Sequence, residues 1–157
     1  MIRVLRTSFL AFAGLVFLLA CGERALFDEA RALPDDGWDF RDTMDFSFVI
    51  TDTSGIYDVY LHVRNEMQYS YSNLWIFIGT TAPNGASQRD TLDLILADET
   101  GRWMGKGTRS INTMLIPYMR NIKFPYLGIY DMEIQHAMRD TVLFHLHDIG
   151  VRIQRVK

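Results

Sequence analysis

The stretch that decides the fold is residues 57–79, YDVYLHVRNEMQYSYSNLWIFIG. In residues 57–64, aromatic or aliphatic side chains at the odd positions alternate with more polar ones at the even positions, which is typical of a β-strand. Residues 69–78 are rich in aromatic and β-branched side chains and contain no proline. A polar break at residues 65–68 separates the two segments. We therefore predict a tight hairpin, which needs further strands over its apolar face.

The rest of the chain contains further short alternating segments separated by turn signals. Residues 108–125 are interrupted by Pro117 and Pro125, and we predict an irregular region with a single strand there. In total we expect about eight strands and no helix within the domain, which favours an antiparallel β-sandwich or jelly-roll-like fold. This all-β domain is predicted to span residues 38–157. The other expected strands lie at residues 46–50, 92–96, 128–136, 142–146 and 149–153.

The N-terminus has the pattern of an export signal. Arg3 and Arg6 precede an uncharged apolar run at residues 9–19, which is too short to cross a membrane comfortably. The sequence Leu-Leu-Ala-Cys at residues 18–21 resembles the bacterial lipobox, and Cys21 is the only cysteine. This resemblance implies a lipoprotein signal peptide at residues 1–20 and a lipid anchor on Cys21. Residues 21–37 are predicted to be the lipidated cysteine and a charged tether. The alternative is a buried free cysteine in an N-terminal helix.

The charge and the cysteine content narrow the class of protein. The formal net charge is −3, and cleavage before Cys21 makes the chain more negative because Arg3 and Arg6 are lost. A mildly acidic domain gives no electrostatic reason to expect nucleic acid as a partner. With its single cysteine acylated, the domain has no internal disulfide, so an apolar core must stabilise it.

Candidate chemistry in the sequence is weak. His145 and His147 have the spacing of side chains on one sheet face, but nothing in the sequence brings a third ligand near them. We predict no metal site and no cofactor. A hydrolase would need two carboxylates about 5–10 Å apart in a cleft. The acidic cluster that could supply them is Asp90, Asp93, Asp98 and Glu99. Because no nucleophile or phosphate-binding motif accompanies it, we predict that the protein is not an enzyme.

The aromatic residues allow a second functional hypothesis. The three tryptophans and seven tyrosines exceed what a small core needs, and such side chains are favoured in binding surfaces. We expect Trp75 to lie in the core, whereas Trp103, flanked by charge and glycine, fits core and surface equally well. A surface glycan-binding β-sandwich lipoprotein is therefore the alternative function.

Several motifs recur in one order along the chain. They are the Leu-x-Ala-Cys of residues 18–21, Tyr57-x-x-Tyr60-x-x-Val63-Arg64-Asn65, Tyr69-x-Tyr71-x-Asn73-Leu74-Trp75, Leu96-Ala97-Asp98, Gly101-x-Trp103-x-Gly105-x-Gly107, Phe124-Pro125-x-x-Gly128-x-Tyr130, Gln135-x-x-Met138-Arg139 and Asp148-Ile149-Gly150-Val151-Arg152-Ile153. In this combination they resemble the gliding-motility lipoprotein GldH family of the Bacteroidota.

This resemblance covers nearly the whole chain after Cys21. It implies a non-enzymatic envelope lipoprotein of the outer membrane that supports gliding motility or type IX protein secretion by contacts with other envelope proteins of those systems. It establishes no catalytic residue. Polar side chains and a ring flanked by glycines are the least obvious core members of the motifs. The candidates for a partner surface are therefore Arg64, Asn65, Asn73, Trp103 and Arg139.

Overall fold

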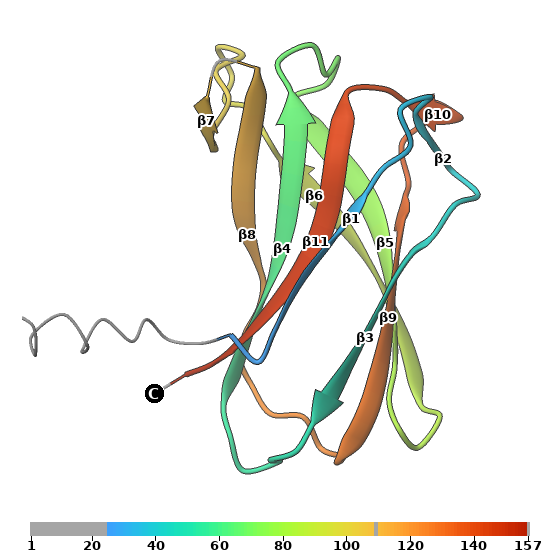
Figure 1. Ribbon diagram of the computed structural model, residues 1–157, viewed down its shortest axis with the longest axis vertical. Coiled ribbons are helices and arrows are strands. Elements are labelled where there is room, and N and C mark those ends of the chain that lie inside the picture. The colour runs from blue at the N-terminus through green and yellow to red at the C-terminus, as the bar shows by residue number, and fades with distance from the viewer. Residues whose placement is uncertain (1–24, 109, 157) are drawn as a thin grey trace, which may run out of the picture.

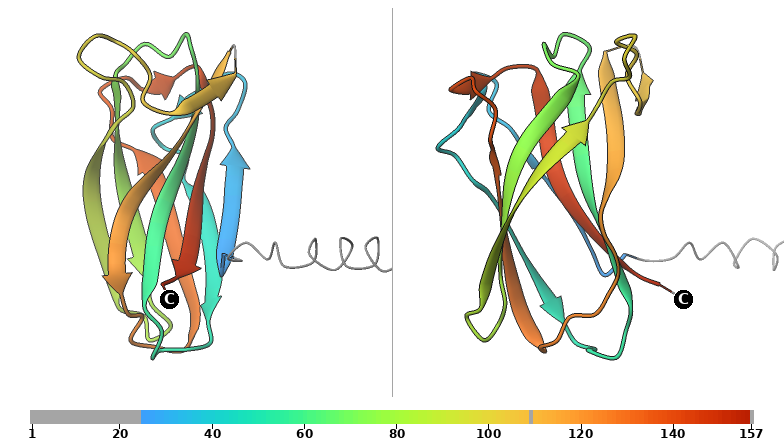
Figure 2. Two further views of the ribbon diagram at one scale, coloured as in Figure 1. Left: turned by 90° about the vertical axis from the view of Figure 1, so that its left-hand side faces the viewer. Right: turned by 180° about the vertical axis from the view of Figure 1, so that it is seen from behind.

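The computed structural model describes residues 25–108 and 110–156 of the 157-residue chain. Its strands form two antiparallel sheets packed face to face, so the prediction of an all-β sandwich is confirmed (Figures 1 and 2). The described residues include no helix, and hence none that is long and apolar enough to cross a membrane. The strands are β1 (Phe27–Ala32), β2 (Trp38–Asp39), β3 (Met44–Ile50), β4 (Tyr57–Glu66), β5 (Asn73–Thr81), β6 (Ser87–Ile95), β7 (Lys106–Thr108), β8 (Ile111–Ile122), β9 (Gly128–His136), β10 (Val142–Leu143) and β11 (Leu146–Arg155).

The core lies between a five-stranded sheet, β1-β11-β4-β8-β7, and a four-stranded sheet, β3-β9-β5-β6. Alternate side chains of the central strands point into it. Leu61 and Val151 from the first sheet and Ile76 and Ile134 from the second all have an exposed fraction of 0 %. A two-stranded ribbon, β10-β2, lies beside one end of the sandwich. We call that end, where β4 ends and β5 begins, the upper end, and the opposite one the lower end, as in Figure 1.

The predicted hairpin at residues 57–79 is wrong, although both strands exist. β4 pairs with β11 and β8, whereas β5 pairs with β6 and β9 in the other sheet. β5 also begins only at Asn73, so residues 67–72 are left to cross between sheets that lie about 10 Å apart in packed sandwiches. Alternation along a strand shows which side chains are buried, but it does not identify the neighbouring strand.

The tether predicted at residues 21–37 is wrong where β1 forms. β1 pairs with β11 over its full length, from Phe27 opposite Ile153 to Ala32 opposite Asp148. The Phe27 ring packs 5.7 Å from that of Phe48 across the sandwich. β1 is an edge strand with five of its six residues exposed, so its sequence, FDEARA, has few apolar positions. The folded domain therefore begins well before Trp38.

The single strand predicted within residues 108–125 is present, but the predicted irregularity is wrong, because this strand, β8, is the longest among the described residues. It includes Pro117, which lies opposite Tyr60 of β4. β7 covers the other side of β8 only as far as Thr113, so β8 is an edge strand at Pro117. A residue without a backbone N–H is tolerated there, since only one side of the strand has hydrogen-bond partners.

Trp75 is not in the core, contrary to the sequence prediction. Its neighbours Leu74 and Ile76 are completely buried, whereas Trp75 is 41 % exposed. Successive residues of a strand face opposite sides of the sheet, so the run Leu-Trp-Ile-Phe-Ile divides between core and surface. On the same outer face, the guanidinium carbon of Arg89 lies over the Phe77 ring, 4.3 Å from the ring centroid. A short apolar run of this kind therefore does not by itself indicate a strand that is buried on both faces.

Candidate functional site

The five predicted partner-surface residues all lie toward the upper end, but they differ in exposure. Arg64 and Asn65 are among the last three residues of β4, Asn73 is the first of β5, and Arg139 follows the end of β9. Trp103 forms an isolated bridge with Ala97. Arg139 is exposed, Asn65 is completely buried, and the other three are partly exposed.

Arg64 neutralises a buried carboxylate on the neighbouring strand. Its Nη1 lies 2.8 Å from Oδ2 of Asp148, whose side chain is only 7 % exposed. The imidazole Nδ1 atoms of His147 and His62 lie 2.9 Å and 3.4 Å from the same carboxylate. A buried charge is costly unless it is paired, so Arg64 has a structural role at this position. Sequence reasoning missed Asp148, because only the register of β11 against β4 brings the two side chains together.

Asn65 cannot contact a partner, so its prediction as a surface residue is wrong. Its side-chain Oδ1 accepts a hydrogen bond of 3.1 Å from Nδ2 of Asn112, which is also buried. The pair lies beneath the glycine-rich segment: a Cβ atom on Gly105 would come within 2.6 Å of Asn112 Oδ1. Glycine is therefore required there for close approach of the chain to β8. Buried amides must be hydrogen-bonded, which explains why both asparagines are needed.

Trp103 lies beside a cavity at the upper end. The cavity has a volume of about 430 Å³, and Met67, Arg102, Trp103 and Asn112 are among its lining residues. The Trp103 ring packs 6.4 Å from that of Tyr69. Burial raises the pKa of the Tyr69 phenol well above its ordinary value, so this hydroxyl stays protonated. Trp103 is therefore half core and half surface, with one side available to a ligand or partner.

Asn73 and the nearby aromatic residues are held by acidic partners. Asn73 Nδ2 donates a 2.7 Å hydrogen bond to Oδ1 of Asp93 on β6. The hydroxyl of Tyr71 donates to Asp140, and this hydrogen bond raises the pKa of Tyr71. These contacts fix the start of β5 and the segment that carries Arg139. The upper end thus presents a positioned surface rather than a set of independent loops.

The acidic cluster does not form a catalytic pair. Asp90 and Asp93 lie on opposite faces of β6, because they are three positions apart and successive side chains of a strand alternate between its faces. Asp90 accepts a hydrogen bond from Tyr118, whereas Asp93 accepts one from Asn73. Asp98 caps its own turn, and the Thr100 hydroxyl and the Arg102 backbone N–H together lower its pKa to about 2. A carboxylate held ionised in a turn is unsuited to act as a general acid near neutral pH. The hydrolase hypothesis therefore loses its basis.

The histidines are likewise divided among separate contacts. Nδ1 of His145 lies 2.9 Å from Glu66, and Nδ1 of His147 lies 2.9 Å from Asp148. His136 is buried beside Trp38, with ring centroids 5.2 Å apart. Within residues 25–108 and 110–156, no group of three or more histidine, cysteine or acidic side chains is arranged to hold a metal ion.

The protein is an antiparallel β-sandwich domain. At its upper end, the Asn65–Asn112 and Arg64–Asp148 pairs lie near a surface of aromatic and cationic side chains. A model of the GldH lipoprotein family matches residues 25–153, and the chain belongs to this family. Membership in a lipoprotein family places the protein at the cell envelope, held there by lipid.

Two curated relatives match nearly the whole chain. A gliding motility lipoprotein GldH homolog from Christiangramia forsetii is 27 % identical, and the alignment covers 90 % of each chain. The gliding motility lipoprotein GldH of Flavobacterium johnsoniae is 25 % identical, with 98 % of each chain covered. Among solved structures, TmCBM61 in complex with β-1,4-galactotriose has a TM-score of 0.37 and 13 % identity, covering 81 % of this chain and 69 % of that chain. A likeness this low carries no functional argument.

Proposed function

We propose that this lipoprotein supports gliding motility, type IX protein secretion or both by binding other envelope proteins through the upper end of its sandwich. The match to the GldH family over residues 25–153 is the observation that carries this proposal. The relatives' names supply the process, and the separate structural hydrogen bonds of Asp90, Asp93 and Asp98 are consistent with a non-enzymatic role. Acyl chains on Cys21 would provide the anchor, with the outer membrane as the proposed location.

Arg139 and Trp103 are the residues best placed to contact a partner. Arg139 is exposed beside the anchored Tyr71–Asp140 pair, and Trp103 has one side open at the cavity. Tryptophan and arginine contribute a large share of the binding energy in protein interfaces when they become buried there. Arg64 and Asn73 lie nearby but are already engaged with Asp148 and Asp93.

A complementation experiment tests this proposal. In a clean deletion strain, wild-type protein should restore colony spreading and secretion of type IX substrates, whereas Arg139→Glu should restore less at equal protein level. Arg120→Glu is the matched control, because Arg120 is 66 % exposed and lies on β8 near the lower end. Normal spreading and secretion in the deletion strain itself would refute the proposed function. Equal loss with both variants would refute the assignment to the upper end.

The cavity beside Trp103 supports glycan binding as an alternative function. An indole ring bordering a cavity of about 430 Å³ can stack on a sugar. If this is the function, the protein should be retained by a polysaccharide in affinity electrophoresis, and Trp103→Ala should abolish that retention. Trp75→Ala, which alters an exposed tryptophan on the outer face of the four-stranded sheet, is the control. Absence of retention on a broad glycan panel would dismiss this alternative.

A further inference from the structure

The position of β1 limits which part of the domain can meet the bilayer. Leu26 already belongs to the fold, since its backbone N–H donates a 2.8 Å hydrogen bond to the carbonyl of Ile153. Only five residues lead from Cys21 to Leu26, and they span at most about 18 Å when fully extended. This argument rests on the proposed acylation of Cys21. The anchor must then lie within that distance of the start of β1.

The domain cannot stand on the bilayer with its upper end down. From Ile153, which is level with the start of β1, β11 runs seven residues back to Leu146 at the upper end. At about 3.3 Å a residue this is roughly 23 Å, which exceeds the reach of the chain from Cys21. The surface proposed for protein partners is therefore not the end that rests on the anchoring membrane.

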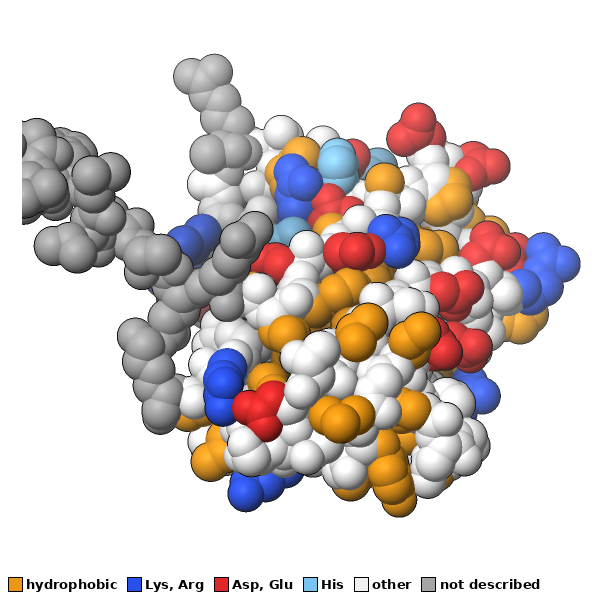
Figure 3. Space-filling model, turned by 60° about the horizontal axis from the view of Figure 1, so that its bottom comes forward, with side chains coloured by type: hydrophobic (Ala, Val, Ile, Leu, Met, Phe, Trp, Pro, Cys, Tyr) orange, Lys and Arg blue, Asp and Glu red, His pale blue; other side chains and the backbone are white. Residues whose placement is uncertain are grey.

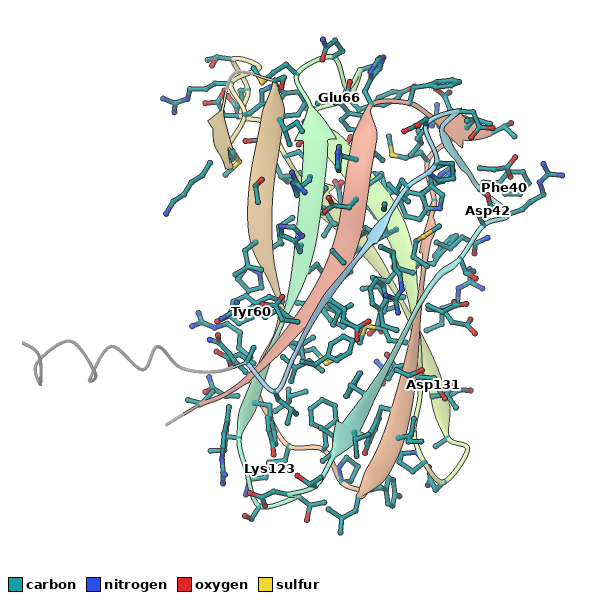
Figure 4. All side chains as sticks on the ribbon, viewed as in Figure 1. Phe40, Asp42, Tyr60, Glu66, Lys123 and Asp131 are labelled. Atoms are coloured by element: carbon teal, nitrogen blue, oxygen red, sulfur yellow. The ribbon has the colours of Figure 1, made fainter. Side chains whose placement is uncertain are left out.

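Away from the lower end, the outer faces of both sheets carry charged side chains. On the five-stranded sheet, Arg152 pairs with Asp28 at 2.7 Å, and Arg64 pairs with Asp148 at 2.8 Å. On the four-stranded sheet, Asp131 accepts a hydrogen bond of 2.6 Å from Ser47, and its side chain lies outside β9 (Figure 4). Moving such charges into an apolar phase is costly.

The lower end, in contrast, exposes large apolar side chains. Val49 and Ile129 lie directly opposite each other on β3 and β9, and they are 52 % and 57 % exposed. Leu127, in the loop just before β9, is 61 % exposed, and Tyr126 beside it is 43 % exposed. Ile56, which immediately precedes β4, is 39 % exposed. Both sheets therefore contribute apolar side chains to one end, and hydrophobic side chains gather on this side of the molecule in Figure 3.

An apolar groove adjoins these residues. It has a volume of about 380 Å³, and Ile122, Pro125 and Tyr126 are among its lining residues. Lys123 lies at the lower end as well (Figure 4), and none of the ion pairs between described residues includes it. Tyrosine and lysine beside aliphatic side chains are the combination found at membrane–water interfaces, where the amine reaches the headgroups.

We propose that the lower end of the sandwich rests on the lipid surface that holds the acyl chains of Cys21, with Leu127, Ile129 and Val49 inserted at the headgroup boundary. The anchor supplies the affinity and the apolar residues set the orientation. The upper end is thereby held outward for its partners. The ligand is the bilayer itself, recognised by exposed apolar area rather than by a specific headgroup.

Site-specific labelling of the full-length lipoprotein tests this orientation. Acylation uses the thiol of Cys21, so a single introduced cysteine can carry an environment-sensitive fluorophore. Leu127→Cys reports on the lower end, and Phe144→Cys, which is 55 % exposed between β10 and β11 at the upper end, is the matched control. On reconstitution into phosphatidylcholine vesicles, we expect emission at position 127 to rise about twofold and to be quenched by brominated acyl chains, while position 144 stays unchanged.

The outcomes separate the anchor from the orientation. Protein that floats with the vesicles but keeps both labels in water would overturn the proposed orientation and leave the anchor intact. Protein that does not float would overturn the acylation of Cys21, and the orientation with it. Cross-linking between copies through position 127 would show that a second copy, not lipid, covers this end. Val49→Cys repeats the measurement on a strand if the loop variant does not fold, and Leu127→Glu should abolish quenching at position 49.

Discussion

Replacing Arg64 with methionine should destabilise the domain, because it leaves the carboxylate of Asp148 without its main counter-charge. Removing one partner of a fully buried pair costs about 3–5 kcal/mol. Here Asp148 is 7 % exposed but Arg64 is 35 % exposed, so water screens part of the interaction. His147, 2.9 Å from the same carboxylate, also remains. We therefore expect a loss of about 2 kcal/mol in the free energy of unfolding, or roughly 6 °C in Tm for a domain of this size.

Urea denaturation of the detergent-solubilised protein at pH 7, followed by the fluorescence of the buried Trp38, measures this loss. Arg120→Met is the control, since Arg120 is 66 % exposed and lies 3.9 Å from Asp58; it should change stability by less than about 0.5 kcal/mol. Adding Asp148→Asn to Arg64→Met removes the unpaired charge and should recover more than half of the loss. A negligible effect of Arg64→Met, or a double variant no more stable than the single one, would refute the reasoning.

Three further predictions concern the core and the upper end. Gly105→Ala should lower the free energy of unfolding by about 2 kcal/mol because its Cβ would press on Asn112, whereas at Gly79 the nearest atom lies 3.8 Å away and Gly79→Ala should be nearly neutral by the same urea assay. Trp38→Ala should cost about 3–5 kcal/mol, measured by calorimetry, because it empties a completely buried site and loses the 2.9 Å hydrogen bond from its indole N–H to the carbonyl of Asp42. Burial lowers the pKa of His136 below its value in the unfolded chain. The contribution of neutral His136 to stability is therefore complete above about pH 6.5 and is lost as the pH falls toward the lowered pKa of the folded state. His136→Phe should consequently make Tm less dependent on pH between about pH 7 and pH 5.

The sequence predicts strands reliably where one face is buried and the other is solvated. β9 is the clearest case, because its alternating side chains give the observed bounds, Gly128–His136. The sequence is insufficient to predict which strands pair with each other and hence which sheet each strand joins. Residues 57–64 and 69–78 are separated by only four residues and both have an apolar face, yet their strands lie in different sheets. Edge strands are more difficult to predict from sequence, because most of their side chains are exposed. β1 therefore lacks the apolar residues that would identify it as a strand.

The candidate site was only partly visible in the sequence for a related reason. Polar residues in strand motifs were assigned to the surface, yet Asn65 is buried because Asn112 of β8 faces it. The carboxylate paired with Arg64 lies 84 residues further along the chain. Neither partner can be found without the register of β4 between β8 and β11. Arg139 and Trp103, whose exposure depends on loops rather than on pairing, are the predictions that remain open to test.

The conformation of one edge strand links the two proposals. If residues 27–32 were part of a tether that continued to residue 37, the chain beyond Cys21 would reach about 50 Å, and either end of the sandwich could meet the bilayer. Pairing with β11 removes that freedom, and it depends on close approach: a Cβ atom on Gly150 would lie 3.0 Å from the Cα of Ala30. Glycine at this position therefore keeps β1 in the sheet and the free chain short. Because the start of β1 and the upper end lie at opposite ends of β11, a short free chain between Cys21 and β1 is what the proposed orientation requires.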